Sequence, residues 1–223
     1  MKKLIIFDWN GTLLSDTLAC MDADNHVIKE FGGTPVNLST FRNTIIIPAI
    51  NFYIQHGCCE NKLKKYPKKL GLTFHSFYEL RANKCRSRRN SKLLLRWLKK
   101  NSIKSIISSN HTIEGINSQL HRLKMIDYIA KVLANSFLDS SMKKRNKREK
   151  IRDYLANHKY KLNEVLIVGD TSEEIEIGKA LGIETVAITD GYYSTKRIKQ
   201  SNPDYLINNL EELIEIIKEN KKK

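Results

Sequence analysis

Short apolar runs alternate with longer amphipathic stretches along most of this 223-residue chain, and this alternation constrains the fold more than any other feature. Apolar runs predict buried strands, whereas apolar residues at three- and four-residue steps predict helices. Their regular exchange is typical of a parallel sheet between helices, an α/β fold. We expect strands at Leu4–Phe7, Ile103–Ser108, Lys131–Ala134, Val165–Val168, Thr185–Ile188 and Tyr205–Ile207, and helices at Thr112–Leu123, Lys147–Asn157, Glu173–Leu181 and Leu210–Ile217.

Residues 15–90 interrupt this alternation. Helical pieces there are separated by Gly32-Gly33, Pro48, Gly57 and Pro67, and no convincing strand is visible. Glycine and proline are the strongest local breakers of regular structure. We therefore expect a small helical domain inserted after the first strand, with residues 1–14 and 91–223 forming the α/β core.

The chain has the composition of an ordinary globular protein, with 41% apolar and 28% charged residues. No apolar run approaches the roughly 20 residues that span a bilayer. The basic pair near the N-terminus resembles that of a signal peptide, but the apolar run after it stops at Asp8 and no small-residue cleavage site follows. We expect a cytoplasmic protein without a membrane partner. Its four cysteines show no ladder of spacings, so we expect reduced thiols.

Positive charge is concentrated in one segment. The formal net charge is +15, and residues 62–104 hold fifteen Lys or Arg with Glu79 as their only acid. Such a surface attracts phosphorylated ligands, nucleic acid or anionic membranes. The alternative is a coding bias, because the whole chain is rich in Lys, Asn and Ile.

The first predicted strand ends abruptly at a carboxylate, Asp8, and the chain then turns at Gly11. Ligands of an open parallel sheet gather beyond the carboxyl ends of its strands, so Asp8 is expected to face the ligand site. The alternative is that Asp8 serves only as a turn or cap residue.

A second strand also ends at acids, because Val165–Val168 is followed by Gly169, Asp170, Glu173 and Glu174. Carboxylates from two strands at one sheet edge suit magnesium, which prefers oxygen ligands and keeps phosphate oxygens as partners. The helix dipole alone would account for Glu173 and in part for Glu174.

A third strand end carries a hydroxyl and an amide, in Ser108-Ser109-Asn110-His111-Thr112, before a predicted helix. Backbone N–H groups at such a helix start bind anions. The alternative is that one serine is merely the N-cap of the helix.

These three strand ends, in this order, resemble the haloacid dehalogenase-like hydrolase superfamily over nearly the whole chain. The first motif of that superfamily has the form D-x-D-G-T. The resemblance makes Asp8 the nucleophile, gives the backbone carbonyl of Asn10 to the metal, and places Thr12 in the phosphate-binding loop. The second motif falls on Ser109, with Ser108 as the fallback and Asn110 beside it as a phosphate-binding residue.

The remaining motifs extend the resemblance. A lysine some twenty residues before the last motif is best matched by Lys147, with Lys143, Lys144 and Lys150 as rivals. The last motif, G-D-x-x-x-D, matches Gly169-Asp170 with Glu174 in its final place. Asp190-Gly191-Tyr192 and Pro203-Asp204-Tyr205 look like the phosphoglycolate phosphatase-like branch, in which a helical cap is inserted between the first two motifs.

The resemblance implies in-line attack of Asp8 on phosphorus and an aspartyl phosphate that water hydrolyses. Magnesium would be held by Asp8, the Asn10 carbonyl, Asp170 and Glu174. Lys147 and Ser109 would bind the phosphoryl oxygens.

Asn10 departs from the family pattern, because phosphatases of this family carry a second aspartate there to protonate the leaving oxygen and then activate water. An amide does neither. Three explanations remain open: a substrate with a good leaving group, a neighbour such as His111 that replaces the acid, or a site that binds phosphate and turns over slowly. Glu174 in place of aspartate is a smaller change, since the longer side chain can hold the metal through water.

The predicted function is that of a Mg²⁺-dependent hydrolase, a phosphatase acting on a small phosphorylated metabolite, with residues 15–90 as its specificity lid. A nucleotide or nucleic-acid-end phosphatase is the second hypothesis, and a non-catalytic phosphate-binding protein is the third. The cluster Arg81, Lys84, Arg86, Arg88 and Arg89 either meets an anionic substrate or forms a solvated face. The sequence indicates neither the substrate nor the oligomeric state.

Overall fold

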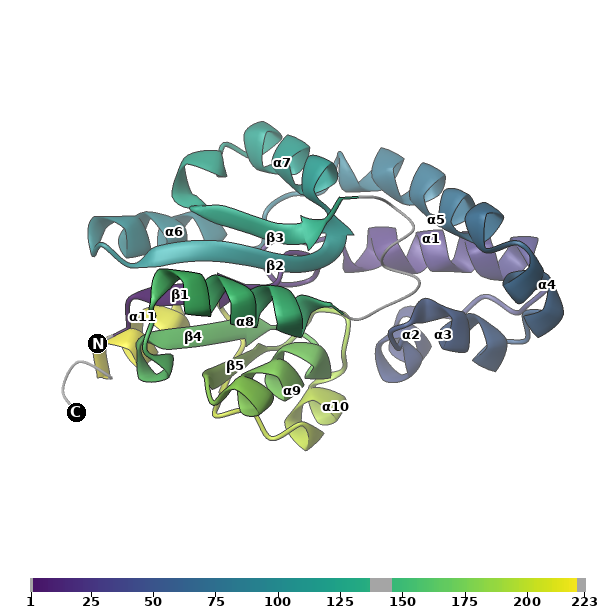
Figure 1. Cartoon of the computed structure of the whole chain (residues 1–223). Coiled ribbons are helices and arrows are strands. Elements are labelled where there is room, and N and C mark those ends of the chain that lie inside the picture. Colours follow the sequence, from purple (N-terminus) through teal and green to yellow (C-terminus); the bar gives the residue numbers. More distant parts are fainter. Residues whose placement is uncertain (1, 137–145, 220–223) are drawn as a thin grey trace.

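The computed structural model describes residues 2–136 and 146–219. Within these ranges a six-stranded sheet has the order β3-β2-β1-β4-β5-β6, and every neighbouring pair is parallel (Figure 1). Its strands are β1 (Leu4–Phe7), β2 (Lys104–Thr112), β3 (Lys131–Asn135), β4 (Val165–Gly169), β5 (Glu184–Ile188) and β6 (Tyr205–Ile207). This confirms the α/β fold predicted from the alternation of apolar patterns.

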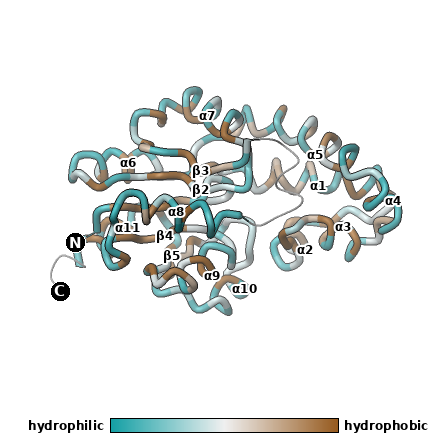
Figure 2. The backbone as a smooth tube through the Cα atoms, viewed as in Figure 1, coloured by the Kyte–Doolittle hydropathy of each residue, from teal (hydrophilic) through white to brown (hydrophobic). Residues whose placement is uncertain are grey.

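Helices cover both faces of the sheet because successive strand residues point to opposite sides. On β1, Ile5 and Phe7 join the core formed with α6 (Ser91–Lys100), α7 (Ile113–Arg122) and α11 (Glu212–Glu219). Leu4 and Ile6 pack on the other face. There they pack against α8 (Lys147–His158) and α9 (Ser172–Leu181). The remaining elements of this part of the chain are α10 (Thr195–Gln200) and two short 3-10 helices, η1 (Ile126–Tyr128) and η3 (Leu162–Glu164). Apolar residues follow the strands, and polar residues follow the outer face of α8 (Figure 2).

The end of β2 differs from the prediction. The strand was expected to stop at Ser108, but it continues to Thr112 with a shift in its pairing to β3 between these two residues. Thr112 is the N-cap of α7, and its Oγ1 accepts a hydrogen bond from Gly115 N at 3.1 Å. The serines before it are therefore not the cap.

Between β1 and α6 the described chain is helical: α1 (Thr17–Glu30), α2 (Leu38–Thr44), α3 (Ala49–Gln55), α4 (Glu60–Lys65) and α5 (Pro67–Ala82). These helices lie together beyond the carboxyl ends of the strands (Figure 1). Their apolar residues form a separate cluster, in which Phe41 and Phe52 pack edge to face. Ile175 and Ile198 of the sheet-side helices join this cluster, so the helical segment, α1–α5, rests directly on the sheet region.

No helix in the described part of the chain has the length and apolar character needed to cross a membrane. The four cysteines are free thiols, as the sequence predicted.

Candidate active site

Asp8 and Lys147 form a buried ion pair at the carboxyl edge of the sheet. Asp8 follows β1 directly, and its backbone N donates to the Val168 carbonyl at 2.9 Å. Lys147 is the first residue of α8. Its Nζ lies 2.9 Å from Asp8 Oδ1, 2.5 Å from Glu174 Oε1 and 3.2 Å from Glu173 Oε2.

Of the rival lysines, Lys150 lies one turn further along α8 and turns away from Asp8. Its Nζ donates to the Ala134 carbonyl at 2.6 Å and to Asn135 Oδ1 at 2.9 Å. Lys143 and Lys144 lie outside the described residues. Within the described chain, Lys147 is therefore the lysine that reaches Asp8.

The charges in this cluster control one another. Burial raises the pKa of the Asp8 carboxyl well above its usual range; the Lys147 ammonium opposes this rise, and the Glu174 and Asp170 carboxylates add to it. Burial alone would lower the pKa of Lys147, but Asp8, Glu174 and Glu173 outweigh it and raise that pKa well above its usual range. Lys147 is thus a permanent cation among several carboxyl groups.

Asp170 lies just after β4 and is fully buried. Its Oδ1 accepts from Thr12 Oγ1 at 2.7 Å, and its Oδ2 accepts from Tyr192 N at 2.6 Å. A Cβ atom at Gly11, which has φ +71°, or at Gly191 would overlap the Asp170 carboxyl, so both positions require glycine. Burial raises the pKa of Asp170 to about 6.

Thr12, which the sequence analysis placed in the phosphate-binding loop, is fully buried, and its hydroxyl is directed at Asp170. This contact holds the Asp170 carboxyl in position.

The donors at this edge fit a magnesium ion in kind. Asp8, Asp170, Glu173 and Glu174 are buried carboxyl groups, and Lys147 pairs with three of them, Asp8, Glu173 and Glu174. Burial and mutual repulsion raise the pKa values of Asp8 and Asp170, which a divalent cation would counteract. Among the described residues no three His, Cys, Asp or Glu side chains already form a ligand cluster. Backbone carbonyl and water ligands would therefore complete the octahedral set that magnesium prefers.

Ser109 and Asn110 lie at the end of β2 and line the same cavity as Asp8. Ser109 Oγ donates to Asn10 Oδ1 at 3.3 Å and accepts from His111 N at 3.1 Å. Asn110 Nδ2 donates to Glu173 Oε2 at 2.7 Å. Ser108, the fallback for Ser109, is buried and does not line this cavity.

Asn10 connects the sheet edge to the helical segment. Its Nδ2 lies 2.8 Å from Asp16 Oδ2 and 2.7 Å from Tyr78 Oη, and its Oδ1 accepts from Ser109. An ionised carboxylate accepts hydrogen bonds but cannot donate them. The side-chain amide of Asn10 is therefore oriented with its NH₂ group toward Asp16.

Asp16 is a residue beside the site that the sequence analysis missed. Besides Asn10, its carboxyl accepts from Gly11 N at 2.7 Å, Tyr78 Oη at 2.7 Å and Tyr192 Oη at 2.8 Å. Its position directly before α1 was the available signal, although its side chain does not cap that helix. Buried and with four donors, Asp16 links the first loop, the helical segment and the loop after β5.

Both ring nitrogens of His111 lie against protein groups. Nδ1 accepts from Thr112 N at 2.5 Å, and Nε2 lies 3.2 Å from Glu79 Oε1 on α5. Although burial raises the pKa of Glu79, hydrogen bonds from His111 and His75 outweigh it and lower that pKa to about 2. His111 therefore connects the sheet edge to α5, and in this conformation it is not placed to substitute for the missing acid.

The basic cluster at residues 81–89 faces mainly away from the site. Lys84, Arg86 and Arg89 are exposed, and Arg81 stacks on Phe77, with 3.6 Å from its Cζ to the ring centroid. Arg88 is the exception, since its guanidinium donates to the carbonyls of Gly11 and Thr189. The cluster as a whole does not line the cavity.

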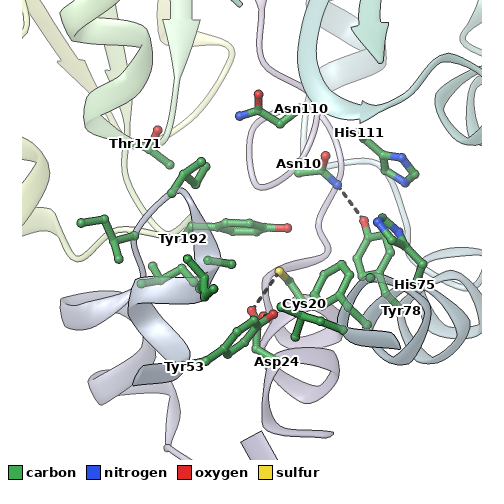
Figure 3. Close-up of a pocket in the computed structure, with 18 of the residues that line it drawn as sticks. Asn10, Cys20, Asp24, Tyr53, His75, Tyr78, Asn110, His111, Thr171 and Tyr192 are labelled. Atoms are coloured by element: carbon green, nitrogen blue, oxygen red, sulfur yellow. Dashed lines mark hydrogen bonds between the residues drawn. The ribbon is translucent and has the colours of Figure 1, made fainter. Parts of the chain in front are cut away.

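A cavity of about 380 Å³ opens from Asp8 and Lys147 into the helical segment. Figure 3 shows Asn10, Asn110 and Thr171 on its sheet side, facing Tyr53, Asp24 and Cys20 on its helical side. One cavity therefore extends from the charged edge of the sheet into the helical segment.

Comparisons with known proteins agree with this geometry. The sequence profile of the haloacid dehalogenase-like hydrolases matches residues 5–188, and the chain belongs to that family. A phosphoglycolate phosphatase from Pseudomonas putida is 21% identical over 222 residues, covering 96% of this chain and 79% of that protein. One from Vibrio parahaemolyticus is 35% identical over 63 residues, which are 28% of each chain. A haloacid dehalogenase-like hydrolase structure from Streptococcus pneumoniae has a TM-score of 0.80 at 18% identity and covers 97% of this chain and 98% of that one.

These matches confirm the predicted superfamily, its phosphoglycolate phosphatase-like branch and the class of enzyme, a phosphatase-type hydrolase.

Proposed function

We propose that the protein is a Mg²⁺-dependent phosphatase of small phosphorylated molecules that works through an aspartyl phosphate on Asp8. The observation that carries this proposal is the buried contact of 2.9 Å between Asp8 and Lys147 at the floor of the cavity. A nucleophile and a fixed cation side by side bring an anionic phosphoryl group to the attacking oxygen.

Each residue has a distinct part in this proposal. The Asp8 carboxylate attacks phosphorus as the bond to the leaving oxygen breaks, and water then cleaves the aspartyl phosphate to regenerate Asp8 and release phosphate. Lys147, Ser109 and Asn110 bind the phosphoryl oxygens. Asp8, the Asn10 carbonyl, Asp170 and Glu174 would hold Mg²⁺, which supplies positive charge between the two anions. Residues 15–90 form the lid over residues 1–14 and 91–223.

Asn10 limits which substrates turn over quickly. General acid–base catalysis is commonly worth about 10²–10⁴-fold, and neither the Asn10 amide nor His111 as placed can supply it. The leaving oxygen must therefore depart with little help from a protein proton donor. Substrates whose leaving group is a stable anion, such as acyl or aryl phosphates, satisfy this condition.

A small substrate is preferred over a nucleic-acid end because the exposed basic residues Lys84, Arg86 and Arg89 do not line the cavity. The nucleic-acid hypothesis predicts binding that weakens steeply with salt.

The test is phosphate release with Mg²⁺ over sugar phosphates, nucleotides, acyl phosphates and a DNA 3′-phosphate. Wild type is compared with Asp8→Ala and with the control Asp22→Ala, whose carboxyl is half exposed on α1. We expect release that is lost in Asp8→Ala, retained in Asp22→Ala and abolished by a chelator. No release above Asp8→Ala on any compound would contradict the proposal and favour a phosphate-binding protein.

A further inference from the structure

The cavity has two chemically different halves. Its sheet half holds Asp8, Lys147, Ser109 and Asn110. Its other half, the apolar chamber, is lined by aliphatic and aromatic side chains of the helical segment, chiefly Ile45, Ile46, Ile50, Leu63, Leu70 and Phe74. A phosphoryl group bound at Asp8 would therefore direct the rest of its molecule toward an apolar wall.

The apolar chamber offers little to a second anionic group. Among its described lining residues Lys64 is the lysine, but its side chain is 64% exposed and lies 2.6 Å from Glu60. The buried acid of the chamber is Asp24, which is 1% exposed. A carboxylate or second phosphate on the substrate would thus meet apolar surface and a carboxyl group, which is unfavourable without a partner cation.

Asp24 provides a polar end to the chamber. Its Oδ1 accepts from Tyr53 Oη at 2.7 Å, and its Oδ2 accepts from Cys20 Sγ at 3.5 Å (Figure 3). A carboxyl group has about four lone-pair sites, so it can accept further hydrogen bonds. Burial raises the pKa of Asp24 to about 7.

The size of the cavity and the chemistry of Asn10 independently favour an aromatic leaving group. A cavity of about 150 Å³ accommodates benzene, so about 380 Å³ is sufficient for a phosphoryl group and a substituted ring. A phenol has a pKa near 10, as in tyrosine, whereas water, like a simple alcohol, has one near 16. A phenolate therefore leaves without the acid that Asn10 cannot provide.

We propose that the apolar chamber receives the leaving group of the substrate, and that the substrate is an aryl phosphate monoester with an uncharged ring and a hydrogen-bond donor directed at Asp24. The proposal rests on the phosphatase function proposed above. In the reaction the Asp8–phosphorus bond forms as the phosphorus–phenolate bond breaks. The phenolate leaves with the electron pair and takes a proton from water.

Binding tests the chamber without requiring turnover. Calorimetry with Asp8→Asn and Mg²⁺ would compare phenylphosphonate with methylphosphonate and phosphonoacetate. We expect phenylphosphonate to bind roughly 10–100-fold more tightly than methylphosphonate, because a buried ring contributes about as much as a buried Phe side chain. Equal affinities, or tighter binding of phosphonoacetate, would overturn the inference.

Variants of the chamber wall locate the effect. Ile46→Asp places a charge in the chamber on a half-buried residue, and Leu72→Asp is its control on α5, where Leu72 is 64% exposed and outside the cavity. We expect kcat/KM for phenyl phosphate to fall roughly 10–100-fold in Ile46→Asp while acetyl phosphate hydrolysis stays within about twofold. Equal losses on both substrates would contradict a role in selecting the ring.

The Asp24 contact has its own test, with 4-(hydroxymethyl)phenyl phosphate against phenyl phosphate. Wild type is expected to have a lower KM for the hydroxylated compound, and Asp24→Asn is expected to reduce this difference in KM. An unchanged difference would show that Asp24 does not contact the substrate. If the phosphonates bind as expected but no compound releases phosphate, the proposed catalytic function fails while the ligand preference of the chamber stands.

Discussion

The two sides of the cavity differ in the kind of side chain that lines them. On the sheet side, three buried carboxyl groups contact Lys147, and Thr12 donates a hydrogen bond to a fourth, Asp170. On the helical side, aliphatic side chains dominate and Asp24 is the buried acid. Buried charged groups need several fixed hydrogen-bond and ion-pair partners, which the edge of a parallel sheet provides. An apolar wall needs only a shape that fits its ligand. Reaction chemistry is therefore expected to depend on the sheet side and substrate choice on the helical side.

The largest effect is expected from removing the cation of the sheet side. Lys147→Ala leaves Asp8, Glu173 and Glu174 without their ammonium, and phosphate release should fall on the order of 10²–10³-fold. The free energy of unfolding should also fall by about 3–5 kcal/mol, because buried charges lose their partner. Lys150→Ala on the same helix is the control. If the activity of Lys147→Ala stays within tenfold of wild type, the reaction does not depend on the cation of the sheet side.

The buried acid of the helical side should give a stability effect of similar size but with a distinct pH dependence. The pKa of Asp24 is about 7 in the folded protein against 3.8 when exposed. The folded state keeps this proton while the unfolded state loses it, so stability falls as pH rises from about 4 to 7, by up to about 4 kcal/mol. Asp24→Asn should remove this loss.

Denaturant titrations of wild type, Asp24→Asn and Asp22→Asn at several pH values measure this difference. Asp22 is half exposed and is expected to leave the pH dependence unchanged. If the free energy of unfolding changes with pH in the same way in Asp24→Asn and in wild type, Asp24 is not the source of the pH dependence.

The boundary between the two sides passes through Asn10 and Asp16. Asn10→Asp alone would bring two carboxyl groups together at the 2.8 Å contact now made by the Asn10 amide. Combined with Asp16→Asn, which restores an amide–carboxylate pair, it should raise turnover of an alkyl phosphate by about 10²-fold, toward the usual value of a general acid. Kinetics of both single variants and the double variant measure this, and no gain in the double variant would show that the chemistry does not need that acid.

A smaller effect is expected at Arg88, which joins the first loop to the loop after β5 through the Gly11 and Thr189 carbonyls. Arg88→Ala should lower the free energy of unfolding by about 1–3 kcal/mol, because two buried carbonyls lose a charged donor. Thermal unfolding against the exposed control Arg89→Ala checks it. Equal stabilities would mean that Arg88 behaves like the rest of the basic cluster.

The sheet side could be predicted from sequence because its order follows from local patterns. Apolar runs located the strands, and a parallel sheet brings the residues after their carboxyl ends together, so Asp8, Ser109 and Asp170 were expected near one another. Lys147 was distinguished from Lys150 only by the structure, since the choice depends on which face of α8 meets Asp8.

The helical side could not be predicted in the same way. Asp16 bonds Tyr78 and Tyr192, which are 62 and 176 residues away in the chain, and no periodic pattern links them. The apolar chamber likewise depends on how the helices of the helical segment, α1–α5, pack together. The sequence shows where these helices are interrupted but not how their faces meet. Thr12 and Arg88 show the same limit, because a hydroxyl and a guanidinium serve a ligand or the protein equally well until their partners are known.

The central claim is that Asp8 is the nucleophile, and the most direct measurement is detection of a phosphoryl group on it. Wild type would be mixed with phenyl phosphate and Mg²⁺, quenched in acid and digested for mass spectrometry. We expect phosphorylation on the peptide containing Asp8, accumulating because Asn10 does not activate the attacking water. Phosphate release from wild type with an unmodified Asp8 peptide at every quench time would contradict the account.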